Sequence, residues 1–200
     1  MEKNENYLKV ASTHGTAWRG HGNFAIKLVE TLKPLVTVEL GVEYGYSSFC
    51  FGYPRIGKVY GVDWFKGDVT MGMKSNPELT KIALLEVYDK IKNQFGVNNI
   101  EFIESEFNDL AKTWDKEIDL LHIDGLHDYD NCKNDCDTWA PLLKENGVIL
   151  FHDTVSNPDG VGLFFSQLEV PKVNFTNSCG LGVASNNSEL IEEIGRVFNV

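Results

Sequence analysis

The stretch Val36–Ser48, with the sequence VTVELGVEYGYSS, decides the fold of this chain. Its first five residues, apolar or β-branched around one glutamate, predict a buried strand. Gly41 and Gly45 follow, and glycine lets the backbone turn sharply and lets a ligand lie against the main chain. A helix beginning just after Gly45 would point its free N–H groups and positive dipole end at that ligand. The stretch therefore predicts a strand, a ligand-binding turn and a helix.

A second predicted strand, Val59–Val62, ends in Asp63. An acidic side chain at this place, beside a glycine-containing loop, is where the two hydroxyls of an adenosine ribose are held. The two motifs together make a nucleoside-cofactor site the leading hypothesis.

Apolar runs and amphipathic stretches alternate through the rest of the chain. Strands are predicted at Thr37–Leu40, Val59–Val62, Ile100–Ile103, Ile118–Ile123 and Val148–Phe151, and helices at Phe24–Leu32, Asn76–Gly96, Tyr129–Asn146, Gly160–Val170 and Ser188–Phe198. Near-continuously apolar strands separated by helices predict an α/β, doubly wound, mostly parallel sheet covered on both faces. Lys172–Thr176 and Gly182–Ser185 predict an antiparallel strand pair at the C-terminal end.

Two of these helices carry an apolar stripe that we expect to be buried. In the helix beginning at Asn76 the stripe is Leu79, Ile82, Leu85, Tyr88, Ile91 and Phe95. In the next long helix it is Tyr129, Cys132, Cys136, Trp139 and Leu143. Such spacing is typical of helices packed on one side against a sheet.

Composition excludes several classes of protein. The net charge of −11 and the pI near 4.9 argue against nucleic acid and against an anionic membrane surface. No apolar run approaches the length of a membrane span, and the first ten residues lack the apolar stretch of a secretory signal. The four cysteines are expected to be free thiols in a reducing cytoplasm. We therefore expect a cytoplasmic protein with a single domain over residues 1–200, of open oligomeric state.

Acidic residues recur at or just after the predicted strands: Glu39, Asp63, Glu104–Glu106, Asp124 and Asp153. In a doubly wound sheet the C-terminal ends of parallel strands open onto one edge, where ligands bind. The recurrence in successive strand–helix units predicts a site at this edge. The segments Phe65–Asn76 and Thr154–Gly160 are expected to flank it, and His14, Trp18 and His21 could reach it from the N-terminal segment.

Four motifs resemble one known family. They are ELGVEYG at 39–45, VYGVD at 59–63, LLHIDGLHDY at 120–129 and GVILFHD at 147–153. Over nearly its whole length the chain resembles the class I S-adenosylmethionine-dependent methyltransferases, in particular the branch that methylates hydroxyls of small molecules and sugars. The resemblance implies a seven-stranded Rossmann-like sheet, with S-adenosylmethionine as cofactor and a small molecule or sugar as acceptor.

The resemblance also implies roles for individual residues. The methionine part of the cofactor would be held by the glycine loop, the ribose by Asp63 and the adenine by the residues after the second and third strands. The implied cofactor-binding residues are Glu39, Gly41, Gly45, Ser47, Ser48, Asp63, Trp64, Ser105, Glu106 and Asp124.

The catalytic residues implied are Asp124 and His127, with His127 as the general base, because an imidazole has an unperturbed pKa near neutrality. Some relatives hold a divalent metal, and by position its ligands here would be Asp124, His152 and Asp153. His152 stands where a carboxylate is more usual, which disfavours magnesium and favours a softer ion. The alternative is that His152 and Asp153 only line the acceptor pocket, while His122 is expected to be a core histidine.

Two other functions stay open on the sequence alone. A nicotinamide-dependent oxidoreductase would use a similar sheet, and Tyr129 and Lys133 have the spacing of one dehydrogenase class. However, Gly41 and Gly45 are spaced G-x-x-x-G, and no G-x-G-x-x-G follows the first strand. A non-catalytic cofactor-binding domain is the other alternative.

Overall fold

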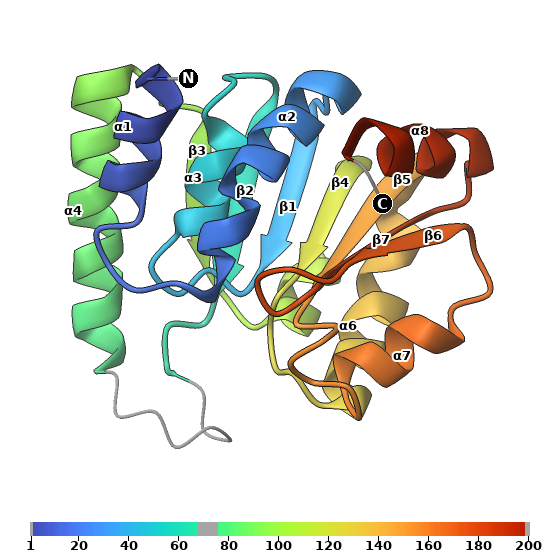
Figure 1. Cartoon of the computed structure of the whole chain (residues 1–200). Helices are drawn as coiled ribbons and strands as arrows, with labels where there is room; N and C mark the ends of the chain where they lie inside the picture. The colour runs from blue at the N-terminus through green and yellow to red at the C-terminus, as the bar shows by residue number, and fades with distance from the viewer. Residues whose placement is uncertain (1, 68–75, 199–200) are drawn as a thin grey trace.

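The computed structural model describes residues 2–67 and 76–198 (Figure 1). Its centre is a seven-stranded sheet in the order β3-β2-β1-β4-β5-β7-β6. The strands are β1 (Val36–Leu40), β2 (Lys58–Asp63), β3 (Ile100–Glu104), β4 (Ile118–Ile123), β5 (Leu143–His152), β6 (Lys172–Phe175) and β7 (Leu181–Ser185). The first five strands pair in parallel, and β7 pairs antiparallel with both β5 and β6. The predicted doubly wound sheet with an antiparallel C-terminal pair is confirmed.

Helices cover both faces of the sheet and enclose two apolar cores. One core packs α1 (Glu2–Ala11), α2 (Gly22–Leu32), α3 (Tyr46–Gly52), α4 (Pro77–Phe95) and α8 (Ser188–Phe198). The other packs α5 (Phe107–Ala111), α6 (Tyr129–Trp139) and α7 (Val161–Gln167). Figure 1 shows α6 and α7 on one side of β5, β6 and β7, with α8 on the other. Neighbouring residues of a strand enter different cores, as Leu120 and Leu121 do, because side chains alternate across a sheet.

Two short elements were not predicted from the sequence. Helix α1 lies ahead of the predicted first helix, and a 3₁₀ helix, η1 (Ala17–His21), connects α1 to α2. Tyr7 of α1 is fully buried and donates a hydrogen bond to the carbonyl of Phe49 at 2.6 Å. The N-terminal segment is therefore part of the core, and η1 brings Trp18 and His21 to the C-terminal edge of the sheet.

The predicted stripe on α4 was wrong at its N-terminal half. Leu79, Ile82 and Leu85 are 61%, 52% and 43% exposed. The buried face instead consists of Thr80, Leu84, Val87, Tyr88 and Ile91. The helix carries two overlapping apolar stripes, and contact with α1 and α3 selects the one that includes Leu84.

The helix predicted to reach Asn146 was also too long. Helix α6 ends at Trp139, a 3₁₀ turn, η2 (Ala140–Leu142), follows, and Leu143 already belongs to β5. Pro141 explains the early end, because proline lacks the N–H that a continuing helix needs. Helix α7 likewise ends at Gln167, short of the predicted Val170.

No helix within residues 2–67 and 76–198 is long and apolar enough to cross a membrane. Residues 68–75 of the predicted flanking segment Phe65–Asn76 lie outside the described part of the chain. The other predicted flanking segment, Thr154–Gly160, follows β5 at the edge where the parallel strands end.

Candidate functional site

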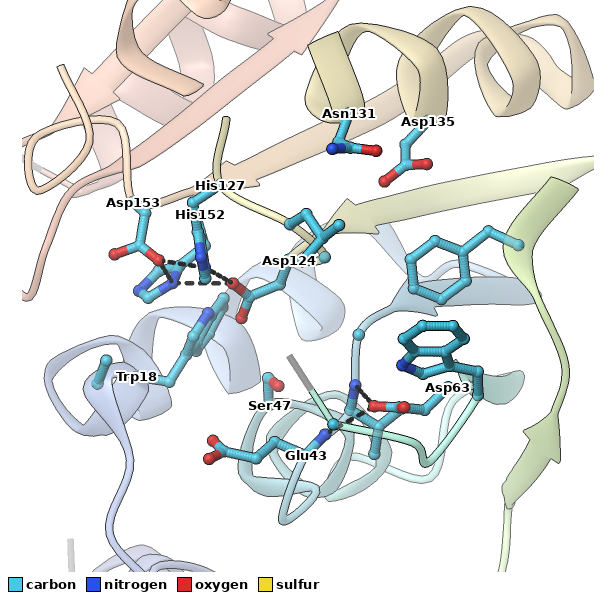
Figure 2. A pocket seen from close by; sticks show the side chains of 18 of the residues that line it. Trp18, Glu43, Ser47, Asp63, Asp124, His127, Asn131, Asp135, His152 and Asp153 are labelled. Atoms are coloured by element: carbon cyan, nitrogen blue, oxygen red, sulfur yellow. Dashed lines mark hydrogen bonds and ion pairs between the residues drawn. The ribbon is translucent and has the colours of Figure 1, made fainter. Parts of the chain in front are cut away.

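A pocket of about 620 Å³ opens at the C-terminal ends of the parallel strands (Figure 2). Its lining comes from η1 and from the segments that follow β1, β2, β3, β4 and β5. This size is within the range of small-molecule and cofactor sites. The pocket therefore lies where the sequence predicted a site.

The glycine loop forms one wall of the pocket. Gly41 has a φ of +90°, and a Cβ there would lie 2.0 Å from the backbone oxygen of Asp124. Gly45 has a φ of +79° and caps α3, and a Cβ there would lie 2.3 Å from Leu84. Both positions need glycine because a side chain would be strained and would collide with a neighbour. The loop is thus held against the end of β4, with Gly41 on the pocket wall and Gly45 behind it.

Asp63 fixes the same loop from the end of β2. One carboxylate oxygen accepts hydrogen bonds from the backbone N–H groups of Val42 at 2.9 Å and Glu43 at 3.1 Å (Figure 2). The other oxygen accepts from the N–H of Phe65 at 2.8 Å. Each carboxylate oxygen can accept more than one hydrogen bond, so Asp63 retains capacity to bind hydroxyls in the pocket that it lines.

Glu39 and Ser48 lie beneath the loop rather than on the pocket wall. Both are fully buried, and the Ser48 hydroxyl donates to the Glu39 carboxylate. Nδ1 of His122, also fully buried, lies 2.8 Å from the other Glu39 oxygen. His122 is therefore a core residue, and this cluster supports the loop from below.

Aromatic and polar residues line the end of the pocket beyond Asp63: Trp64, Phe65, Ser105, Glu106, Phe107, Asn108, Asn131, Asn134 and Asp135. The first six follow β2 and β3, whereas Asn131, Asn134 and Asp135 lie on α6. Figure 2 shows Asn131 and Asp135 on the face of α6 that is turned toward the pocket. The ring faces and the polar groups together suit a flat, polar-edged ligand.

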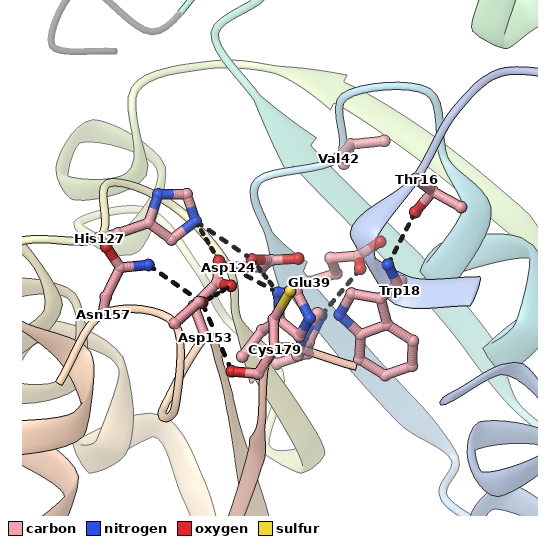
Figure 3. Close-up of polar contacts among 12 residues, drawn as sticks. Thr16, Trp18, Glu39, Val42, Asp124, His127, Asp153, Asn157 and Cys179 are labelled. Atoms are coloured by element: carbon pink, nitrogen blue, oxygen red, sulfur yellow. Dashed lines mark hydrogen bonds and ion pairs between the residues drawn. The ribbon is translucent and has the colours of Figure 1, made fainter. Parts of the chain in front are cut away.

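Two histidines and two aspartates form a cluster at the opposite end of the pocket; Figure 2 labels all four, and Figure 3 shows His127, Asp124 and Asp153 from another side. Nε2 of His127 lies 2.7 Å from Asp153 Oδ2 and 3.7 Å from Asp124 Oδ1. Nδ1 of His152 lies 3.1 Å from Asp124 Oδ1 and 3.3 Å from Asp153 Oδ2. Each imidazole therefore faces both carboxylates.

This pairing shifts the titration of all four groups. Asp124 and Asp153 raise the pKa of His127 to about 10, against the desolvation that accompanies partial burial. Burial lowers the pKa of His152, but the same carboxylates outweigh it and raise the value to about 11. Burial alone would raise the pKa of Asp124 and of Asp153. The imidazoles outweigh burial and hold both pKa values below the usual range of an aspartate. His127 thus differs from the imidazole of near-neutral pKa that the sequence predicted.

Asp124, His152 and Asp153 also have the arrangement of a metal site. Each offers one ligand atom, and the three atoms lie within 4.8 Å of one another. Two carboxylate oxygens and one imidazole nitrogen form a donor set suited to a transition metal rather than to magnesium. The residues present therefore fit a divalent cation.

A strained hairpin supports this end of the pocket. Ser178 and Cys179, between β6 and β7, have φ values of +44° and +72°. The Ser178 carbonyl lies 2.9 Å from Nε2 of His21 and 3.3 Å from Nε2 of His152. Burial lowers the pKa of His21 to about 4, so this imidazole is neutral. His21 therefore supports the hairpin rather than facing an acceptor, while Trp18 and Cys179 reach the pocket wall.

The structure places most of the predicted site residues on one pocket. These are Gly41, Ser47, Asp63, Trp64, Ser105, Glu106, Asp124, His127, His152 and Asp153. Glu39, Gly45 and Ser48 lie behind it. His14 stacks on Tyr44, with ring centroids 4.8 Å apart.

Sequence reasoning missed the α6 residues and Glu43. Asn131 and Asp135 are four residues apart, so they share a helix face, and that spacing is the signal that could have shown them. Glu43 lies within the glycine motif itself.

Acidic groups outnumber basic groups in the pocket. Its described lining contains neither lysine nor arginine, and the imidazoles of His127 and His152 are outnumbered by six carboxyl groups, those of Glu43, Asp63, Glu106, Asp124, Asp135 and Asp153. Burial raises the pKa of Glu43, and the nearby carboxylates of Asp124 and Asp63 add to this shift. The pocket therefore favours a ligand that carries positive charge.

Comparisons with known proteins agree with this geometry. The family described as "Methyltransferase domain" matches residues 38–154, more than half of the chain. The chain is also 33% identical over 189 residues to a Sinorhizobium fredii protein named "Uncharacterized protein y4gI". The match covers 88% of this chain and 20% of that protein, so the chain spans about a fifth of the length of this relative.

Solved methyltransferases share the fold. The S-adenosylhomocysteine-bound methyltransferase PaMTH1 of Podospora anserina has a TM-score of 0.65 and 17% identity, covering 90% of this chain and 86% of its own. The O-methyltransferase TomG of Streptomyces achromogenes, solved with S-adenosylmethionine, has a TM-score of 0.64 and 14% identity, covering 92% and 89%. The family match and these folds lead to one conclusion: the chain belongs to the methyltransferase domain family.

Proposed function

We propose that the protein transfers a methyl group from S-adenosylmethionine to a hydroxyl oxygen of a small molecule or sugar. The observation that carries the proposal is that one acidic pocket joins the glycine loop to the His127–Asp153 pair. The cofactor supplies a methyl group on a positively charged sulfur. The solved relatives that contain S-adenosylmethionine or S-adenosylhomocysteine support this choice of cofactor.

The cofactor would lie along the pocket with its ribose at Asp63. Gly41 and Ser47 line the part nearest α3, where backbone N–H groups and the positive helix end suit the methionine carboxylate. Trp64, Ser105 and Glu106 would surround the adenine. The surplus of acidic over basic groups in the lining suits the sulfonium charge.

The acceptor would lie between the cofactor and the histidine–aspartate cluster. His127 lines the pocket and is oriented by Asp153, as a general base must be. Because Asp124 and Asp153 hold a proton on His127, the imidazole acts as a base only when a bound cation, the sulfonium included, offsets their charge. Alignment of the methyl group and the acceptor oxygen by the pocket walls supplies the rest of the rate enhancement.

Asp124, His152 and Asp153 would hold a divalent cation in the same cluster. Such a cation would lower the pKa of an acceptor hydroxyl and fix its direction. The Ser178 carbonyl beside Nε2 of His152 supports this role, because ligand imidazoles commonly donate their other N–H to an oxygen.

The proposal is tested by turnover with a panel of catechol and sugar acceptors, measured as S-adenosylhomocysteine and methylated product by mass spectrometry. Each reaction is run with a chelator and with added manganese or zinc. Methylated product that disappears in His127→Gln supports the proposal. Failure of the chain to bind S-adenosylmethionine in calorimetry would refute it.

A non-catalytic cofactor-binding domain is the second candidate. It would bind S-adenosylmethionine equally well but yield no product with any acceptor of the panel. The nicotinamide-dependent alternative loses its support, because Lys133 pairs with Asp137 on the exposed side of α6 and the family match is to methyltransferases.

A further inference from the structure

Asp135 is a buried carboxyl group on the pocket wall that the proposed reaction does not use. It is 6% exposed and lies on α6, away from the histidine–aspartate cluster. Its one hydrogen bond within the described residues comes from the Asn134 side chain at 3.5 Å, which is the outer limit for such a bond. A carboxyl group buried with so little compensation is costly unless a ligand supplies a partner.

The surroundings of Asp135 show which kind of ligand would fit. A Cβ on Gly125 would lie 3.1 Å from Asp135 Oδ2 and 2.9 Å from the Phe107 ring. The carboxyl and the ring therefore border the same narrow space, which stays open because residue 125 is glycine. Trp64, Phe65 and Phe107 make this end of the pocket aromatic. A flat heteroaromatic ring with a polar edge suits such a space.

The side-chain N–H groups of the neighbouring asparagines on α6 already have acceptors. Nδ2 of Asn131 donates to Asp128 at 2.7 Å, and Nδ2 of Asn134 donates to Asn108 at 3.2 Å. Asp135 is thus the buried polar group of this end with unused capacity. Burial, with a smaller contribution from Asp128, raises the pKa of Asp135 to about 7, so the carboxyl can both donate and accept.

We propose that Asp135 recognises the amino-bearing edge of the cofactor's adenine, with one oxygen accepting from the exocyclic amine and the other donating to ring nitrogen N1. The inference rests on the proposed function, because it assumes an adenosyl cofactor with its ribose at Asp63. It adds a residue that reads the identity of the base. A purine ring that lacks the 6-amino group has no donor at this position and would leave one Asp135 oxygen without a partner.

The test is calorimetric binding, to the full chain, of S-adenosylhomocysteine and of its analogue whose purine lacks the 6-amino group. The wild type is expected to prefer the adenosyl ligand. Asp135→Ala should weaken adenosyl binding by about 10- to 100-fold and bring the two affinities within about threefold of each other. Asp135→Asn should keep the preference, because an amide presents the same donor and acceptor as a protonated carboxyl. Asp130→Asn, at an exposed position of the same helix, should match the wild type.

The outcomes separate this inference from the proposed function. If S-adenosylhomocysteine binds the wild type and Asp135→Ala keeps the full base preference, Asp135 does not read the base and only this inference fails. If neither ligand binds the wild type, the proposed function fails and the inference with it. Should Asp135→Ala not fold, Asp135→Ser removes the carboxyl with less loss of polarity and takes its place.

Discussion

Replacement of Asp135 by asparagine should change how the stability of the protein depends on pH. Burial raises the pKa of this carboxyl to about 7, whereas in the unfolded chain it lies near the ordinary value of 3.8. Between these pH values the folded protein keeps a proton that the unfolded chain releases. Stability from this group is therefore complete below about pH 4 and is lost as the pH rises through 7. At about 1.4 kcal/mol per pKa unit, the gap between the two pKa values sets a ceiling of about 4 kcal/mol on what this group contributes to the free energy of unfolding.

The measurement is urea unfolding of the wild type and Asp135→Asn, followed by tryptophan fluorescence from pH 4 to pH 8. The amide does not titrate, so the variant should gain stability relative to the wild type as the pH rises, approaching about 4 kcal/mol at pH 8. Taking the difference between the two proteins removes the contributions of the other titrating groups. Asp130→Asn serves as the control and should run parallel to the wild type. A difference that stays constant within about 0.5 kcal/mol across the range would show that Asp135 is not perturbed and would refute the reasoning.

Three further outcomes follow from the pocket. Asp63→Asn should weaken S-adenosylmethionine binding by at least about tenfold in calorimetry, because one of the two oxygens that accept backbone N–H groups is lost; unchanged affinity would contradict the role of Asp63. His127→Gln should lower the turnover rate by about 10²- to 10⁴-fold while S-adenosylhomocysteine affinity stays within about threefold of wild type, and full activity would remove His127 as the base. His152→Ala should weaken manganese or zinc binding by at least about tenfold in calorimetry of metal-free protein, and equal binding by wild type and variant would exclude the candidate metal site.

The sheet could be predicted from the sequence because each strand carries its own signal. The five parallel strands are short apolar runs, and each has an acidic or glycine residue within two positions after its predicted end. The glycine loop was also readable, since Gly41 and Gly45 both need the positive φ that the structure gives them. These features depend on the local chain alone.

Features that depend on packing were harder to predict. Helix α4 offers both Leu79 and Leu84 to a core, and only its contacts with other helices determine that Leu84 is buried. The properties of the site residues also depend on their contacts with other elements. The near-neutral pKa expected of His127 is a property of the isolated imidazole, whereas the structure places two carboxylates against it. Glu39 was expected at the cofactor, but its burial with His122 is a consequence of the pairing of β1 with β4.

The contacts of Ser178 connect both ends of the chain to the histidine–aspartate cluster. Its carbonyl lies beside His21 from the segment before α2 and beside His152 at the end of β5, although 157 residues separate Ser178 from His21. The strands on either side of it belong to the same core as α2 and α3, through Phe175, Leu181 and Val183. Removal of β6 and β7 would therefore leave His21 and His152 without the carbonyl that they share and would open the core beside α2.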